Sequence, residues 1–297
     1  MKGAIYCQRV SSIDTRLMEC YNFDTIRLPI TYSLRRTILM KAIIVAAGMG
    51  SRLEHLTEDT PKCLLPVDGK SILQYQLDAY RAHDINDIHI VKGYRHEKID
   101  LPDITYYLNE SYKSNNILLS LMHAESAMDG MFMASYSDII FHPDVVGRLK
   151  ASDGSISVIV DVGWKTQYEG RSDHPISEAE KVVFDEDGYV REIGKVIDHP
   201  DDAQGEFIGL MKCSQEGAET FKGYYQQAVA TFSCKPFVRA AEFRYAFVTD
   251  LLQYMIGHGV LVQAVTIQRG WHEIDTVQDI TRVRSSVFGD TPPQSNS

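Results

Sequence analysis

Two glycines and two cations form the segment of the sequence with the clearest capacity for chemistry. Gly48 and Gly50 stand just after an apolar run, and Arg52 and Lys62 follow within reach of the same loop. Glycines let a backbone approach a ligand closely and turn its N–H groups toward phosphate oxygens. A dinucleotide-binding fold would have a third glycine where Leu53 stands, and a P-loop would have a G-K-[ST] triplet. The segment predicts a phosphate-binding loop of neither class; a tight turn followed by two surface cations is the structural alternative.

Two aspartates are the candidates for binding a metal ion. Asp138 follows an apolar run, and Asp275 follows a second, shorter run. Mg²⁺ prefers one or two protein carboxylates, with phosphate oxygens and water completing its coordination. We therefore expect Asp138 and Asp275 to bind Mg²⁺, although a turn residue and a helix N-cap are the structural alternatives. Asp144, Asp279 and Glu273 are weaker candidates, for which surface or capping roles suffice.

The pattern of the chain around these residues predicts an α/β fold. The strand-like runs are residues 41–47, 87–94, 104–109 and 131–141, and the helical patterns between them are 71–83 and 115–126. Such alternation is typical of β-α-β units, so we expect a Rossmann-like, mostly parallel central sheet flanked by helices. Ligands on such sheets bind at the carboxyl ends of the strands, where the glycine loop and Asp138 stand.

The second half of the chain has a different pattern and predicts a mixed β and helical extension lobe. The strand-like runs are residues 155–162, 206–213 and 261–267, with a hairpin at 181–194 that turns about Asp187 and Gly188. Residues 215–258 are largely helical in pattern, and residues 276–287 close the domain as a helix. We find no internal repeat.

The loop and its cations lie within a longer string that carries a family resemblance. Residues 45–65 read VAAGMGSRLEHLTEDTPKCLL, and this string resembles the nucleotidyltransferases that make activated sugars, activated choline or activated phosphonates. The resemblance implies a fold of the nucleotide-diphospho-sugar transferase type. It also implies that the loop holds the nucleotide and that two catalytic cations grip its triphosphate. These roles fall on the loop residues Ala46, Ala47, Gly48, Met49 and Gly50, and on Arg52 and Lys62.

Two further segments resemble the cytidylyltransferase branch of that family. Residues 271–280, WHEIDTVQDI, are similar to its C-terminal metal motif and place the second metal aspartate at Asp275, with Asp138 as the first. Residues 109–121 resemble the segment beside the base and ribose, which implies nucleotide contacts for Asn115, Asn116 and Ser120. A helix cap at Ser114 or Asn115 is the structural alternative there.

One more residue has a position from which it can approach the base. Tyr94 follows the second strand of the alternating region. We expect it to contact the nucleotide, and a tyrosine buried at the sheet edge is an equally good interpretation.

The acceptor is predicted from residues 161–183, 193–195 and 205–209, which look like the phosphonate branch. That branch includes cytidylyltransferases acting on 2-aminoethylphosphonate and on hydroxyethylphosphonate. Arg171 and Lys195 can hold an anionic phosphonate, the arginine through a bidentate fork, and a lysine at 195 matches the catalytic substrate-side cation of the family. Asp161, Glu180 or Glu206 can pair with an amine on the same substrate.

The aromatic residues of this stretch have two interpretations. Trp164 and Tyr168 can face a quaternary ammonium by cation–π attraction, as a phosphocholine acceptor would require. They can equally form the core of the lobe, with residues 178–181 as a solvated helix face. His174, which precedes a proline, is interpreted as structural.

Together these residues predict an enzyme that transfers CMP from CTP to a small phosphonate, releases pyrophosphate and depends on Mg²⁺. The acceptor is already an anion at neutral pH, so its oxygen can attack the α-phosphorus in line without a general base. The alternatives within enzymes are a phosphocholine cytidylyltransferase and a sugar-1-phosphate nucleotidyltransferase. The alternative outside enzymes is a regulatory subunit that only senses a nucleotide.

The domain organisation follows from where these motifs begin and end. Residues 1–39 have neither clean periodicity nor motifs. They are interpreted as an N-terminal extension that is either disordered or not part of the native protein, and an oligomerisation arm is the alternative. Residues 40–288 form the nucleotidyltransferase domain, with a nucleotide-binding half at 40–150 and an acceptor-binding half at 151–288. Residues 289–297, rich in Pro, Ser and Asn, are a disordered tail.

Composition excludes several classes of partner. The formal net charge of -10 argues against nucleic-acid binding, since such proteins usually carry net positive charge. No apolar run approaches the roughly 18 residues of a membrane span and no signal peptide is evident, so we expect a cytoplasmic protein without membrane contact. A homodimer is the default expectation. The cysteines have no C-x-x-C pair and are expected to be reduced thiols: Cys7, Cys20, Cys63, Cys213 and Cys234.

Overall fold

The computed structural model describes residues 39–283 of the chain. Residues 1–38 of the predicted extension, the predicted tail at 289–297, Cys7 and Cys20 lie outside the described residues. The three described cysteines, Cys63, Cys213 and Cys234, are free thiols. Among the helices of residues 39–283, none combines the length and the apolar character that crossing a bilayer requires.

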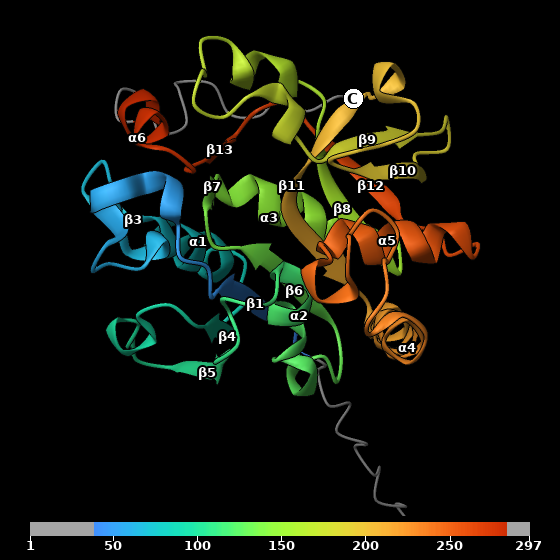
Figure 1. Cartoon of the computed structure of the whole chain (residues 1–297), viewed down its shortest axis with the longest axis horizontal. Coiled ribbons are helices and arrows are strands. Elements are labelled where there is room, and N and C mark those ends of the chain that lie inside the picture. Colours follow the sequence, from blue (N-terminus) through green and yellow to red (C-terminus); the bar gives the residue numbers. More distant parts are fainter. Residues whose placement is uncertain (1–38, 284–297) are drawn as a thin grey trace, which may run out of the picture. The chain divides into compact units, whose positions relative to one another are not determined.

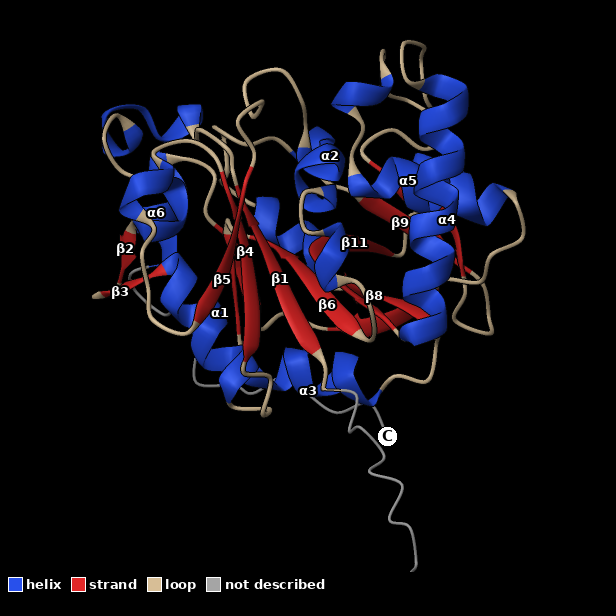
Figure 2. Cartoon of the chain, turned by 90° about the horizontal axis from the view of Figure 1, so that it is seen from below, coloured by secondary structure: helices blue, strands red, loops and turns tan. Residues whose placement is uncertain are grey.

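A twisted sheet runs through the described part of the chain, and its first half is parallel (Figures 1 and 2). Strand β1 (Lys41–Ala46) lies between β4 (Asp87–Lys92) and β6 (Phe132–Tyr136) and is parallel to both. Strand β5 (Ile104–Leu108) continues the sheet beside β4, again in parallel. The strand-like runs of the sequence are confirmed here, and so is the mostly parallel sheet with flanking helices.

The second half of the sheet is mixed, as the pattern predicts. Strand β11 (Gly205–Cys213) is antiparallel to β6 and also to β8 (Ile156–Asp161) and β9 (Lys181–Phe184). The remaining strands are β10 (Val190–Gly194), which forms the predicted hairpin with β9, and β12 (Gln263–Ile267), which is parallel to β8. Because β11 pairs with β6, one sheet joins the two predicted halves.

Helices cover both faces of this sheet (Figure 2). Their bounds are α1 Ile72–Arg81, α2 Ile117–Met122, α3 Pro143–Ala151, α4 Gln215–Phe232, α5 Val248–Gly257 and α6 Val277–Val283. Alternate residues of β1 enter two cores, because successive strand residues point to opposite faces. Ile43 and Val45 pack with α2, α4 and α5, whereas Ala42 and Ile44 pack with α1 and α3.

Helix α3 is an element that the sequence patterns did not predict. It begins with Pro143, which is compatible with the first helical turn. The remaining predicted helices are present. Helices α1 and α2 are shorter than their patterns, and residues 233–247 between α4 and α5 are not an α-helix. The last residues of the predicted helix 276–287 lie outside the described residues.

Short elements complete the fold. A two-stranded antiparallel ribbon consists of β7 (Ile139–Phe141) and β13 (Trp271–Glu273), and a second one of β2 (Pro66–Val67) and β3 (Lys70–Ser71). The 3-10 helices are Ser51–Thr57, Lys62–Leu64, His96–Lys98, Glu125–Ala127, Trp164–Tyr168, Ile176–Glu178, Pro200–Asp202 and Phe243–Tyr245. The first ribbon lies beside the carboxyl ends of the sheet and carries both predicted metal aspartates.

Candidate active site

One pocket at the carboxyl ends of β1 and β6 collects most of the residues predicted to act on the substrates. Predicted residues that line it are Ala46, Gly48, Gly50, Arg52, Lys62, Asn116, Asp138, Glu180, Lys195, Glu206 and Asp275. They come from the first strand and its loop, from the ribbon, and from strands of both halves of the sheet. Segments far apart in the sequence therefore meet at the place where α/β sheets bind ligands.

The glycine loop has the backbone that its sequence predicts. Gly50 has φ +62°, and a Cβ atom there would lie 3.0 Å from the Cβ of Lys62. A side chain at this position would therefore be strained and would displace the lysine. A Cβ atom at Gly48 would meet no other described residue within 4 Å, so this glycine leaves its side of the loop open to a ligand.

The ribbon brings the two aspartates together. The amide of Ile274 donates a 2.8 Å hydrogen bond to the carbonyl of Asp138, which places Asp275 beside Asp138. Lys62 Nζ lies 3.1 Å from Asp138 Oδ2 and also contacts Asp275 Oδ1. Burial opposes the charge of Lys62, but the two carboxylates outweigh it and raise the pKa of the lysine. The ammonium group is thus held where two carboxylates meet.

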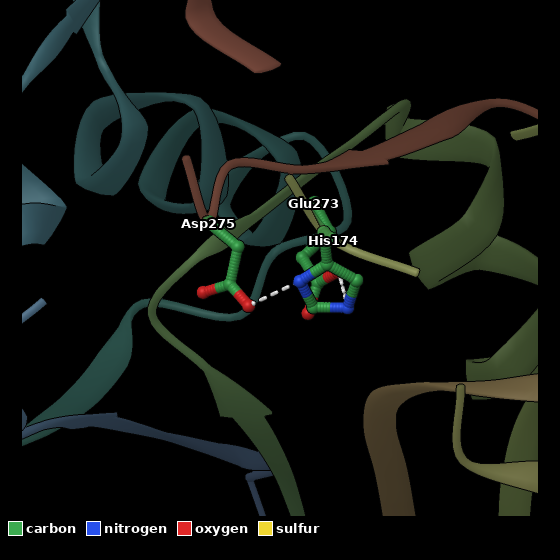
Figure 3. Close-up of side chains that lie close together, drawn as sticks. All are labelled: His174, Glu273 and Asp275. Carbon is green, nitrogen blue, oxygen red and sulfur yellow. Dashed lines mark ion pairs between the residues drawn. The ribbon is translucent and has the colours of Figure 1, made fainter. Parts of the chain in front are cut away.

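Asp275 is the most heavily contacted carboxylate of the site. Its Oδ2 atom lies 2.5 Å from Arg52 Nη2 and 2.9 Å from His174 Nδ1, and Figure 3 shows the imidazole between Asp275 and Glu273. Although burial opposes ionisation, Lys62, His174 and Arg52 hold the pKa of Asp275 well below its ordinary value. Asp275 is therefore an anion throughout the physiological pH range.

These carboxylates fit a divalent metal ion. Asp138 Oδ1 is buried and has no hydrogen-bond partner among the described residues, so it can accept a further cation. Asp138 and Asp275 already share one cationic neighbour, and Glu273, His174 and Asp275 have ligand atoms within 4.8 Å of one another. Carboxylates that converge in this way, one with an unused oxygen, suit the oxygen-rich coordination of Mg²⁺.

The pocket lining also includes two buried acidic side chains, Glu180 and Glu206. Glu180 is buried, and its Oε1 accepts a 2.7 Å hydrogen bond from Thr249; burial raises the pKa of Glu180 to about 7. Glu206 Oε1 accepts a 2.5 Å hydrogen bond from the hydroxyl of Tyr168. Burial and the neighbouring Glu273 raise the pKa of Glu206 well above its ordinary value.

Lys195 is a further residue of the pocket lining. Its Nζ atom is 2.9 Å from Glu178 Oε2 and 4.9 Å from the centre of the Phe247 ring. Glu178, Lys195 and Phe247 all line the pocket.

Several predicted nucleotide contacts do not line this pocket. Tyr94 donates a 2.9 Å hydrogen bond to the carbonyl of Thr57 and so supports the glycine loop from outside. The side chains of Asn115 and Ser120 bond to Asn109, at 2.9 Å each. Ala47 and Met49 also lie outside the lining, and Met49 is exposed. Asn116, by contrast, reaches the pocket from the start of α2.

Three predicted acceptor residues are likewise not brought to the pocket, because other partners occupy them. Asp161 accepts hydrogen bonds from the Gly163 amide at 2.8 Å and from the Trp271 indole at 2.8 Å. Trp164 packs with Tyr168 in a small separate core, as the structural interpretation of these aromatics has it.

Arg171 is the third of these residues, and it serves the ribbon and α6. It holds Asp279 at 2.7 Å and Glu273 at 3.0 Å in a buried network. Asp279 also accepts hydrogen bonds from the amides of Asp275 and Thr276, so it caps α6. The capping role predicted for Asp279 is confirmed.

Three site residues were missed by the sequence argument, and a fourth, Glu273, was only a weaker metal candidate. His174, which contacts Asp275, was assigned to structure. Glu178 was assigned to a solvated helix face, and Phe247 was not considered. Spacing gave a signal only for Glu273, which stands two residues before Asp275 in the same short run.

Comparison with known proteins agrees with this geometry. The family profile of the MobA-like NTP transferase domain matches residues 42–186. The CTP:phosphoglutamine cytidylyltransferase of Campylobacter jejuni is 29% identical over 254 residues, which are 81% of this chain and 98% of that protein. The choline-phosphate cytidylyltransferase of Streptococcus pneumoniae is 35% identical over 106 residues, 34% of this chain and 46% of that protein.

Solved structures share the fold. The CTP:phosphocholine cytidylyltransferase from Streptococcus pneumoniae aligns with a TM-score of 0.63 at 22% identity, over 84% of this chain and all of that one (100%). The inositol-1-phosphate CTP transferase from T. maritima aligns with a TM-score of 0.64 at 21% identity, over 86% of this chain and 98% of that one. With the pocket and its residues, these matches show that the chain carries a MobA-like NTP transferase domain at residues 42–186 and is an enzyme similar to cytidylyltransferases.

Proposed function

We propose that this enzyme transfers CMP from CTP to a small acceptor bearing a phosphonate or phosphate group and releases pyrophosphate. The observation that carries the proposal is the convergence of Arg52, Lys62, Asp138 and Asp275 in one pocket beside the glycine loop. A triphosphate needs several cationic neighbours. Arg52 and Lys62 provide two of them at the end of the sheet where phosphates bind, and the two aspartates can hold a divalent cation there.

The barrier to this reaction is mainly electrostatic, because two phosphorus anions must approach each other. The backbone of the glycine loop binds the nucleotide phosphates, and Arg52 and Lys62 hold the triphosphate. Lys195, at the acceptor end, binds the attacking anion and orients its oxygen toward the α-phosphorus. When bound by Asp138 and Asp275, Mg²⁺ supplies charge neutralisation for the triphosphate and for the leaving pyrophosphate. No side chain has to remove a proton, since the acceptor is already ionised.

For the acceptor we propose a small phosphonate, 2-aminoethylphosphonate or hydroxyethylphosphonate. Lys195 supports an anionic group in the pocket, and the buried side chains of Glu180 and Glu206 in the same lining suit a polar substituent. The second candidate is a phosphate ester or a related phosphorylated amine. It is supported by the substrates that the relatives' names give, phosphoglutamine and choline phosphate.

The test is ³¹P NMR of the products formed from CTP and Mg²⁺ with 2-aminoethylphosphonate, hydroxyethylphosphonate or phosphocholine. We expect pyrophosphate and a new phosphorus anhydride with one acceptor, and no product from a Lys62→Met variant purified in parallel. Binding of CTP without turnover with every acceptor would instead support a regulatory protein. Faster turnover of UTP or dTTP with a sugar phosphate would identify a sugar nucleotidyltransferase.

A further inference from the structure

The pocket lining holds two chemically distinct sets of side chains. The glycine loop, Arg52 and Lys62 provide N–H groups and cations. Glu180 and Glu206 also line the pocket and are both buried, with exposed fractions of 7% and 4%. Acidic groups do not stabilise a phosphorus anion as Arg52 and Lys62 can, so they do not serve the phosphorus group. A ligand that reaches both sets must therefore carry, besides its phosphorus group, a group that acidic side chains bind.

Glu206 identifies that character most directly. Its Oε1 atom is occupied by the Tyr168 hydroxyl, but its Oε2 atom is buried and has no partner among the described residues. A buried carboxyl oxygen is normally hydrogen-bonded. Because Glu206 lines the pocket, a donor on a bound ligand can supply the partner that Oε2 lacks among the described residues.

Three aromatic residues, Trp164, Tyr168 and Phe247, are not free to bind a quaternary ammonium group. Such a group has no N–H and is bound by the open faces of several rings. Trp164 and Tyr168 pack in a separate core, and Phe247 already has Lys195 over its ring. Glu180 and Glu206 can instead accept hydrogen bonds from N–H groups.

We propose that the acceptor presents N–H donors, from a primary ammonium or a carboxamide, to Glu206 and Glu180, and that Glu206 determines acceptor specificity. This inference rests on the proposed cytidylyl transfer and narrows its acceptors. Within the phosphonates it favours 2-aminoethylphosphonate over hydroxyethylphosphonate, and it disfavours phosphocholine.

A purely structural role for Glu206 makes a different prediction. If the Glu206 carboxyl group only anchors Tyr168, then replacing it should weaken the reaction of every acceptor equally. If it binds the acceptor, its removal should affect only acceptors that carry an N–H. The ratio of kcat/KM between two acceptors separates the two roles, because a general disturbance of the fold cancels in that ratio.

The experiment compares four phosphonates of similar length in a pyrophosphate-release assay with CTP and Mg²⁺. They carry an ammonium (2-aminoethylphosphonate), a carboxamide (3-phosphonopropanamide), a trimethylammonium (the N-trimethyl derivative of the first) and a methyl group (propylphosphonate). We expect the better of the two N–H acceptors to exceed the trimethyl and methyl acceptors by about 10- to 100-fold in kcat/KM, the range expected for a satisfied buried acceptor. Whether the ammonium or the carboxamide is better identifies the source of the N–H.

In Glu206→Gln we expect this preference to fall by about tenfold or more, with propylphosphonate turnover within about twofold of the wild type. Tyr168→Phe removes the anchoring hydrogen bond while retaining the carboxylate, and it should keep the preference. Glu219→Gln, an exposed position on α4, is the matched control. Equal losses for all acceptors in Glu206→Gln, or equal turnover of the trimethyl and ammonium acceptors by the wild type, would overturn the inference alone. Absence of pyrophosphate release with every acceptor would overturn the proposed function and the inference with it.

Discussion

At the scale of single residues, the cations of the site are paired with carboxylates of the same pocket. Lys62 contacts Asp138 and Asp275, Arg52 contacts Asp275, and Lys195 contacts Glu178. The nucleotide and the acceptor must replace these internal partners with their own phosphate oxygens. Internal pairing keeps the cations in place before the substrates arrive, because a buried charge without a partner is costly.

The first prediction concerns Lys62. In Lys62→Met, kcat/KM should fall by about 100-fold or more, since a preorganised charge at the phosphates is lost. Far-UV circular dichroism should be unchanged. Lys98→Met, an exposed position on the 3-10 helix His96–Lys98, is the control and should retain full activity. Near-normal turnover in the Lys62 variant would contradict the assigned role.

The second prediction concerns the stability contributed by Glu180. Burial raises the pKa of this carboxyl from 4.5 to about 7 in the folded protein. Between these two values the folded state binds the proton more tightly than the unfolded state, so the free energy of unfolding falls as pH rises from about 4.5 to about 7. The pKa difference corresponds to a loss on the order of 3 kcal/mol.

Glu180→Gln removes this titration while keeping an oxygen for Thr249. Urea denaturation at pH 5 and pH 7.5 should show a smaller loss of stability in the variant than in the wild type. The exposed control Glu219→Gln should follow the wild type. If both variants and the wild type lose the same free energy, Glu180 is not the buried titrating group.

At the scale of elements, the sequence predicted what depends on local pattern. The strands of the alternating half, the hairpin of β9 and β10 and the strand of β11 follow from apolar periodicity and from turn residues. Helix α3 was missed, since its pattern directly follows a strand and is short. The ribbon of β7 and β13 was not predictable, because each strand has three residues and the partners are distant in sequence.

The site followed the same division between local and long-range information. The loop residues and the two aspartates were identified because each stands at a strand end in a recognisable string. Arg171 was assigned to the acceptor since an arginine in a polar loop has no local sign of its partners. Its actual partners, Asp279 and Glu273, are about one hundred residues away. Long-range ion pairs of this kind leave no mark in the local pattern.

The third prediction tests the network of Arg171. Arg171→Met leaves the buried Asp279 and the partly buried Glu273 without their cation, and loss of the partner of a buried charge typically costs about 3 to 5 kcal/mol. The melting temperature should fall. The KM for MgCTP should also rise, because Asp279 holds the amide of Asp275. Arg81→Met, exposed at the end of α1, is the control and should change neither quantity appreciably. An unchanged melting temperature in Arg171→Met would show that the network is not stabilising.

At the scale of the whole molecule, an acidic protein must bind two anions. The formal charge is -10, and the cationic groups of the pocket are few and already paired. A divalent cation is the simplest means of making the site net attractive to a triphosphate, since it adds two charges at the convergence of carboxylates. The residues can hold such an ion, as the unused oxygen of Asp138 indicates.

The fourth prediction is therefore a metal requirement. Low-millimolar EDTA should abolish pyrophosphate release, and excess Mg²⁺ should restore it. Ca²⁺ should restore it poorly, because its looser coordination holds phosphate oxygens less strictly. The circular dichroism spectrum should be the same with and without EDTA. Full activity in EDTA would contradict a metal-dependent mechanism.

The short ribbon of β7 and β13 has a consequence for how such an enzyme can diversify. Its register alone places Asp138 against Asp275, so one inserted residue in either strand would turn an aspartate away while the sheet stayed intact. The surface loops between these two strands take no part in that pairing. They can change in length or side chains while the register of the ribbon keeps Asp138 beside Asp275.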